Sequence, residues 1–363
     1  MNYIISIRTA IIVFPIISVI FTIPFILHNY HKYGSINPFR VLIIYSFILY
    51  MITIYFLVIL PLPNKSEVVF KTNMVRLIPL EFIRDFMRET SFDIQNPSTY
   101  LHTLMEPCFY TVAFNLLMTV PFGMYMRYYF KCNLKKTIVF SFMLSLFFEI
   151  TQLTGLYFIY PYAYRVFDVD DLIINTLGGI IGYALMGIID DYLPTREEID
   201  NKSLKNSMTV SGLRRIAIFY LDSFLFISIF LLLSLFLQIR CLLLIVFVIY
   251  YIFVPYMTNG YTLGSKFLNV RLYFEKNRLV NIVFRIVFLF TYYYGIMFFS
   301  MYLLVFIRKM MNLNVGRTLL LFALGITMAL LFYIVNALIL LVSKKHFYDK
   351  LFKVSYVSTI KVE

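Results

Sequence analysis

The chain has 363 residues, of which 61% are hydrophobic and only 14% are charged. Average soluble domains are about 45–50% apolar and about 25% charged, so this composition excludes a soluble enzyme and a disordered chain. It predicts an all-α polytopic membrane protein whose outer surface faces lipid. The net charge of +13 fits the Lys and Arg excess of cytoplasmic membrane loops better than nucleic-acid binding.

Nine stretches contain the roughly 20 predominantly apolar residues that a spanning helix needs. They lie at 9–27, 41–62, 107–126, 137–160, 169–189, 216–237, 241–257, 282–307 and 318–342. The seventh is separated from the sixth by only QIR at 238–240. The first is too long for the core of a signal peptide and lacks a small-residue cleavage site, so we expect it to remain as an anchor.

The polar segment 190–211 separates a block of five spans from a block of four. We therefore expect four segments along the chain. They are an N-terminal anchor span (1–40), a first membrane domain (41–190), a cytoplasmic linker (191–211) and a second membrane domain (212–360).

The distribution of Lys and Arg predicts the orientation. With the N-terminus outside and the C-terminus in the cytoplasm, the cytoplasmic segments hold 20 of these residues and the exterior segments hold 11. This bias is the one that bacterial-type membrane proteins show in their cytoplasmic loops. The sequence thus predicts a multi-pass protein of the plasma membrane with the N-terminus outside.

One loop, 63–106, is too long to be a simple connector. Its stretch VRLIPLEFIRDFM (75–87) alternates apolar and charged residues at helical spacing. We expect an amphipathic helix lying on the outer surface, with a charged, solvated loop as the alternative.

Polar side chains gather in the third, fourth and fifth spans, where they are costly and therefore suggest function. The candidate exterior cluster consists of Asn115, Glu149, Gln152, Arg165, Asp168, Asp171 and Asn175. The amides alone could simply tie helices together. Glu149 requires either a cation partner such as Arg165 or protonation, because burial of a lone carboxylate is expensive. We expect these groups to line a pocket open to the exterior leaflet.

Glycine and proline residues of the same spans carry structural predictions. Gly178, Gly179 and Gly182 include a GxxxG pattern that permits close helix approach. Pro121 and Gly123 are expected to kink or end the third span, because proline removes a backbone donor.

The motifs AFNLLMTVPFG, FEITQLTG and RVFDVDDLIINTLGGIIGY occur in this order. Together they resemble the VanZ-like membrane proteins over roughly residues 40–190, with Arg165, Asp168 and Asp171 fitting the last element. The resemblance implies a role in lowering susceptibility to lipoglycopeptide antibiotics of the teicoplanin type. It does not supply a reaction.

The second block contains GLRRIAIFYLDSFLF, then GYTLGSKFLNVRL, then a basic tail. This arrangement resembles the RDD membrane family, in which Arg214 or Arg215, Asp222 and Asp349 would fill the places of one Arg and two Asp. Asp222 lies two helical turns from the arginines, on the same face. We expect either an Asp222–Arg pair that holds helices in register or a binding role.

These observations favour a VanZ-like protein that alters how the cell surface or membrane handles lipoglycopeptides. The alternatives are an intramembrane enzyme acting on a lipid or lipid-linked glycan, and an ion-coupled transporter using Glu149 and Asp222. Nothing resembles a hydrolase nucleophile with its base or a P-loop. We expect no cofactor and no metal, no nucleic acid, and membrane lipid as partner, with a lipid-linked cell-wall precursor or the drug itself as further ligands.

Overall fold

The computed structural model describes residues 3–274, 277–311, 314–343 and 347–360. Within these residues, eight helices are long and apolar enough to cross a membrane. The prediction of an all-α polytopic membrane protein is confirmed. Strands are limited, in the described part, to two two-stranded sheets.

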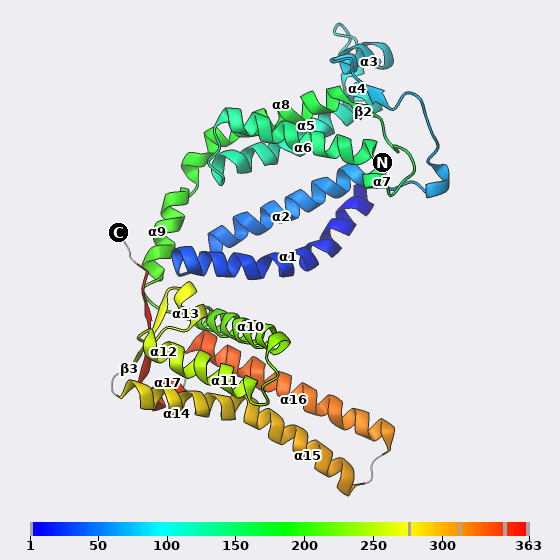
Figure 1. The fold of residues 1–363 in the computed structure, drawn as a ribbon. Coiled ribbons are helices and arrows are strands. Elements are labelled where there is room, and N and C mark those ends of the chain that lie inside the picture. Colours follow the sequence, from blue (N-terminus) through cyan, green and yellow to red (C-terminus); the bar gives the residue numbers. More distant parts are fainter. Residues whose placement is uncertain (1–2, 275–276, 312–313, 344–346, 361–363) are drawn as a thin grey trace. The chain divides into compact units, whose positions relative to one another are not determined.

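The chain divides into two compact units (Figure 1). Unit 1 comprises Met1–Phe21 and Pro38–Ile199, and unit 2 comprises Thr22–Asn37 and Asp200–Glu363. The first helix, α1 (Tyr3–Tyr33), contributes residues to both. The second boundary lies within α9 (Arg196–Asn206), a polar helix in the segment predicted to be a linker.

The remaining elements of unit 1 are mostly helices. In chain order these elements are α2 (Pro38–Ile59), η1 (Lys65–Glu67), β1 (Val75–Arg76), α3 (Glu81–Glu89), α4 (Ser98–Leu104), α5 (Pro107–Tyr128), α6 (Leu134–Leu153), α7 (Gly155–Phe158), β2 (Phe167–Asp168), α8 (Val169–Ile189) and η2 (Asp190–Tyr192).

Helix α8 packs closely against α5 and α6, and the three run side by side (Figure 1). A Cβ at Gly178 or Gly182 would collide with backbone carbonyls of α5, and one at Gly179 with Ser141 of α6. The predicted close approach at these glycines is confirmed. Helix α5 continues through Pro121 to Tyr128, so of the two predicted effects of this proline, a kink or an end of the third span, the end is wrong.

The outer loop contains a shorter helix than predicted. Residues 75–76 form strand β1, parallel to β2, and the helix begins only at Glu81. Leu80, which follows Pro79, has a left-handed φ of 64°, so a continuous helix over 75–87 is wrong. The amphipathic part is α3, which has no buried residue.

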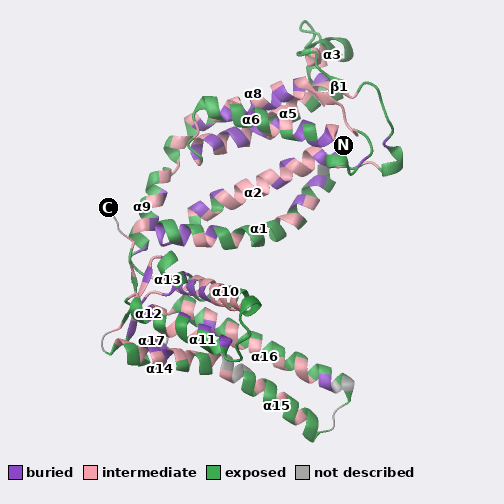
Figure 2. Ribbon diagram, viewed as in Figure 1, coloured by how far each residue is buried: buried purple, intermediate pink, exposed green. Residues whose placement is uncertain are grey.

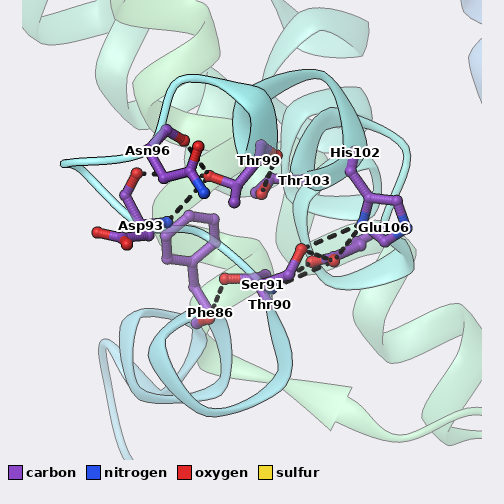
Figure 3. A network of polar contacts seen from close by, with 9 residues as sticks. All are labelled: Phe86, Thr90, Ser91, Asp93, Asn96, Thr99, His102, Thr103 and Glu106. Atoms are coloured by element: carbon purple, nitrogen blue, oxygen red, sulfur yellow. Dashed lines mark hydrogen bonds and ion pairs between the residues drawn. The ribbon is translucent and has the colours of Figure 1, made fainter.

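A polar network holds the rest of this loop together (Figure 3). The Glu106 carboxylate accepts hydrogen bonds from the Ser91 hydroxyl (2.8 Å) and the Ser91 backbone N–H, and pairs with His102 Nδ1 at 3.0 Å. These contacts join the end of α4 to the segment that follows α3. The hydrogen bond that the Ser91 hydroxyl donates stabilises the charged form of the Glu106 carboxylate, and this holds the pKa of Glu106 below its ordinary value.

Unit 2 contains the C-terminal helices and the second sheet. Its elements after α9 are α10 (Gly212–Phe236), α11 (Leu242–Val248), η3 (Ile249–Phe253), α12 (Val254–Met257), α13 (Leu263–Phe267), β3 (Val270–Phe274), α14 (Arg278–Phe290), η4 (Thr291–Gly295), α15 (Ile296–Met310), α16 (Val315–Val342), α17 (Phe347–Leu351) and β4 (Val354–Ser358). Strands β3 and β4 are antiparallel, with Val270 opposite Ser358.

The seventh predicted span, 241–257, corresponds to a shorter apolar helix at Leu242–Met257. At about 1.5 Å per residue this helix covers roughly 24 Å, less than the approximately 30 Å of a hydrocarbon core. The other eight predicted stretches each coincide with a helix of spanning length.

The end of α1 forms part of the core of unit 2. Tyr30 is 1% exposed and packs with Ile218, Leu268 and Val270. Its hydroxyl lies 3.3 Å from the Ser211 hydroxyl. Exposed residues run along the long helices (Figure 2). Many of them are large hydrophobic residues, such as Leu235 (77% exposed), which suits a lipid solvent.

Candidate functional site

A cavity of about 270 Å³ opens in unit 1 among α2, α5, α6 and α8. Its apolar wall includes Leu57, Phe114 and Phe148. Its polar lining consists of Thr111, Asn115, Glu149, Gln152, Arg165, Asp171 and Asn175. Six of the seven residues predicted for the exterior cluster therefore share one cavity.

Two carboxylates of the cavity are held by neutral donors. Glu149 is 3% exposed and accepts the backbone N–H of Asp168 at 3.0 Å. Asp171, in the first turn of α8, accepts the Asn115 side-chain N–H at 2.6 Å. Neither carboxylate forms an ion pair with a described residue.

Arg165 does not form an ion pair with Glu149, which was one of the two alternatives for this carboxylate, the other being protonation. Its Nη1 instead donates to the Val58 carbonyl at 2.8 Å, and Gln152 Nε2 donates to the same oxygen at 2.9 Å. Val58 lies in the last turn of α2, where carbonyls have no helical donor. The negative end of the helix dipole also favours a guanidinium there. Arg165 thus ties the end of α2 to the cavity.

Asn175 presents an unpaired acceptor at the cavity. The side chain is 4% exposed, and its Nδ2 donates to the Ser145 hydroxyl at 2.9 Å. Its Oδ1 is buried without a hydrogen-bond partner among the described residues. A buried unpaired acceptor is costly, so a donor group of a ligand in the cavity would be favoured here.

Asp168 is the predicted cluster residue that does not line the cavity. Its side chain caps α8 by accepting the Asp170 N–H at 2.9 Å, and it lies 3.9 Å from Arg76 Nη1. Burial raises the pKa of Asp168 above its ordinary value. Its side chain positions α8, while its backbone N–H positions Glu149.

Asp170, one of the aspartates at the start of the fifth span, was left out of the candidate cluster, and Ser145 was missed as a site-building residue. Asp170 is 4% exposed and accepts the backbone N–H groups of Leu80 (2.5 Å) and Phe82 (2.8 Å), which anchors the start of α3. Ser145 precedes Glu149 by four residues and Gln152 by seven, so helical spacing alone could have placed it on the same face.

In unit 2, Asp222 and Arg215 do not form the predicted pair. The Asp222 carboxylate accepts the Tyr250 hydroxyl (2.7 Å), the Thr262 hydroxyl (2.6 Å) and the Gly264 N–H (2.8 Å). A shared helix face permitted the Arg215 pairing, but the 260–264 loop supplies closer donors.

Arg215 pairs instead with Asp349 of α17 at 3.0 Å. Arg285 Nη2 lies 3.5 Å from the other oxygen of the same carboxylate and donates to the Tyr356 hydroxyl at 2.7 Å. Burial raises the pKa of Tyr356, which therefore stays neutral. These contacts fasten the tail segment 347–358 to α10 and α14.

Arg214 has a purely structural environment. It is 0% exposed, and its guanidinium donates to the carbonyls of Ser207, Leu268 and Asn269 and to the Ser358 hydroxyl. It therefore joins α10 to β3 and β4. In the described residues, no group of three or more His, Cys, Asp or Glu could hold a metal ion.

The fold and site define a polytopic helical membrane protein with a polar, carboxylate-bearing cavity inside its N-terminal helical bundle. The family model VanZ/LLP1 matches residues 47–190, which contain every polar residue of that cavity. This match supports the VanZ-like resemblance of the first half, and no finding supports an RDD domain in the second. No curated protein and no solved structure matches the chain.

Proposed function

We propose that the chain is a VanZ-like plasma-membrane protein that lowers susceptibility to lipoglycopeptide antibiotics of the teicoplanin type. In this proposal it changes how the cell surface or membrane handles the drug. The observation that carries it is the coincidence of the cavity with the residues that match the VanZ/LLP1 model.

The cavity has the chemistry to hold an amphiphile. The acceptors of Glu149, Asp171 and Asn175 face the same space as the aromatic wall formed by Phe114 and Phe148. Hydroxyl or ammonium donors of a lipid-linked precursor or of the drug would satisfy the acceptors, and its apolar part would contact the aromatic rings. Membrane lipid is the partner that such a site implies.

A second candidate function is an intramembrane enzyme acting on a lipid or lipid-linked glycan. The observation that favours it is that two carboxylates, Glu149 and Asp171, line one cavity. Paired carboxyl groups in distinct environments can divide the roles of general acid and base.

For the second half, we infer an RDD-like arrangement. Two contacts between motif residues support it. Asp222 accepts hydrogen bonds from Thr262 and Gly264, and Arg215 forms an ion pair with Asp349. Both are satisfied contacts between separate chain segments, which favours a scaffolding role over ion transport.

The testing experiment is deletion of the gene, followed by a susceptibility panel of teicoplanin-type drugs against vancomycin and by lipid analysis of the same membranes. The proposal predicts selective sensitisation to the lipidated drugs, restored by the intact gene. Altered lipid-linked glycan with unchanged susceptibility would favour the enzyme instead. An unchanged profile in both measurements would reject both functions.

A further inference from the structure

Unit 2 contains a groove of about 580 Å³ that belongs to neither constellation described above. It lies between the loop that follows α12, strand β3 and the first turn of α14. Its lining residues are Tyr256, Asn259, Arg271, Leu272, Tyr273, Phe274, Asn277, Arg278, Leu279 and Val280.

Two arginines converge on this groove from different elements. Arg271 Nε donates to the Asn259 carbonyl at 2.7 Å, and Arg278 Nη1 donates to the Asn259 side-chain oxygen. Neither arginine forms an ion pair with a described residue. Asn259 therefore orients both guanidinium groups, and two positive charges face the groove without a counter-ion from the described chain.

The wall that carries Asn259 is fixed to β3. Gly260 has a φ of 103°, and a Cβ there would collide with the Leu272 carbonyl. The Leu272 N–H donates to the Gly260 carbonyl at 3.0 Å. Asn259 itself has a left-handed φ of 60°, a conformation that asparagine tolerates better than most residues. The arginines are thus held on a built scaffold.

One edge of the groove is apolar. Leu279 and Val280 are 46% and 49% exposed, and Tyr256 stacks under Arg278 with 5.0 Å between the guanidinium carbon and the ring centre. Arg278 is the first residue of the helix Arg278–Met310, one of the eight of spanning length. The groove therefore joins a cationic floor to the start of a lipid-facing helix.

We propose that this groove binds the phosphodiester headgroup of an anionic membrane lipid. The planar guanidinium fork matches phosphate oxygens and is the side chain that binds phosphate with two parallel hydrogen bonds. The apolar edge would take the first carbons of the acyl chains. Free phosphate shares the headgroup chemistry but cannot use that edge, so the two sources are distinguishable.

The test uses the purified full-length chain and native mass spectrometry with added phosphatidylglycerol or phosphatidylcholine. Phosphatidylglycerol should bind more tightly than phosphatidylcholine, and Arg271→Gln or Arg278→Gln should each weaken its binding about tenfold, the loss expected for one charged hydrogen-bonded contact. Arg271→Lys should give an intermediate value, since it keeps the charge without the fork. Inorganic phosphate at equal concentration should not displace the lipid.

The matched control is Lys205→Gln, which removes one positive charge from an exposed position on α9 outside the groove. It should leave phosphatidylglycerol binding unchanged. Equal weakening by the control would show general charge attraction and overturn the proposal, as would full displacement by inorganic phosphate. Thermal melting of each variant separates loss of binding from misfolding, and Arg271→Lys remains interpretable if a glutamine variant does not fold.

Discussion

The Asn115 amide donates to the Asp171 carboxylate across 2.6 Å, from the middle of α5 to the first turn of α8. This bond is made inside a cavity, beside Glu149 and Asn175. It holds Asp171 by a neutral donor, while Arg165, the cation that lines the same cavity, donates to the Val58 carbonyl rather than to this carboxylate.

Removal of that donor should destabilise the bundle. Asn115→Ala leaves the Asp171 oxygen without its amide and should lower the free energy of unfolding by about 1–3 kcal/mol. Asp171→Asn in the same chain should recover part of the loss, because the unsatisfied group is then neutral. The measurement is thermal unfolding in detergent of both single variants and the double variant. Strictly additive losses would contradict the direct coupling.

Glu149 carries the sharpest test of the cavity. Glu149→Gln keeps the shape of the side chain and its acceptor for the Asp168 N–H but removes the charge. We expect loss of drug protection at normal membrane abundance, and the same for Arg165→Gln and Asp171→Asn. Glu197→Gln, at an exposed carboxylate of α9, is the control and should protect like the unchanged chain.

Abundance is measured by immunoblot of membranes in the same strains. Full drug protection by all three cavity variants at normal abundance would show that the cavity is not the functional site. Low abundance would instead indicate misfolding.

The Arg215–Asp349 pair makes a different prediction for unit 2. Removing one partner of a buried ion pair costs about 3–5 kcal/mol, so Asp349→Asn should lower the abundance of the chain. Adding Arg215→Gln should partly restore it, because one uncompensated charge is removed. The same second change should not rescue Asp222→Asn, whose carboxylate has other partners. If Arg215→Gln restored the abundance of Asp222→Asn but not that of Asp349→Asn, the result would contradict the structure.

The Glu106 network should loosen in acid. The pKa of Glu106 is lowered in the folded loop, mainly by its hydrogen bond from Ser91, from an ordinary value of 4.5. A lowered pKa gives stability that is present above the ordinary value and is lost as the pH falls through the folded value. After correction for the intrinsic exchange rate at each pH, the protection of residues 86–106 against hydrogen exchange should therefore fall below about pH 4.5. In Glu106→Gln the corrected protection should be lower at neutral pH and should no longer change over this pH range.

The charge bias predicts the orientation of the spans. Reporter fusions should place residues 127–136 and the tail after Val342 in the cytoplasm, and residues 64–106 outside, because Lys and Arg concentrate on the cytoplasmic side. A tail found outside would reject this orientation. The short helix Leu242–Met257 is the segment whose crossing this fusion series tests most directly.

The sequence predicted the spans and the members of the cavity because both depend on local patterns. Length and hydropathy define a helix such as Val169–Ile189, and spacing places Glu149 and Gln152 on one face. Spacing does not say which other element meets that face. Arg165 could equally have reached Glu149 or the end of α2, and Arg215 could have reached Asp222 or Asp349. The sequence likewise does not distinguish the three aspartates at 168, 170 and 171. In the structure Asp168 caps α8, Asp170 binds the outer loop and Asp171 lines the cavity.

Tyr30 of α1 fills the core of unit 2, where the other buried residues of its cluster are Ile218, Leu268 and Val270. A ribosome that has delivered Tyr30 must therefore make about 190 further residues before the first of these three buried partners, Ile218, exists. At about 5–20 residues per second, that interval lasts on the order of ten seconds or more. During this time Tyr30 has none of its three buried partners from the later part of unit 2. A fragment that starts at residue 200 would lack Tyr30 in this core permanently. Supplying residues 1–37 as a separate chain is the way to restore the missing core residue.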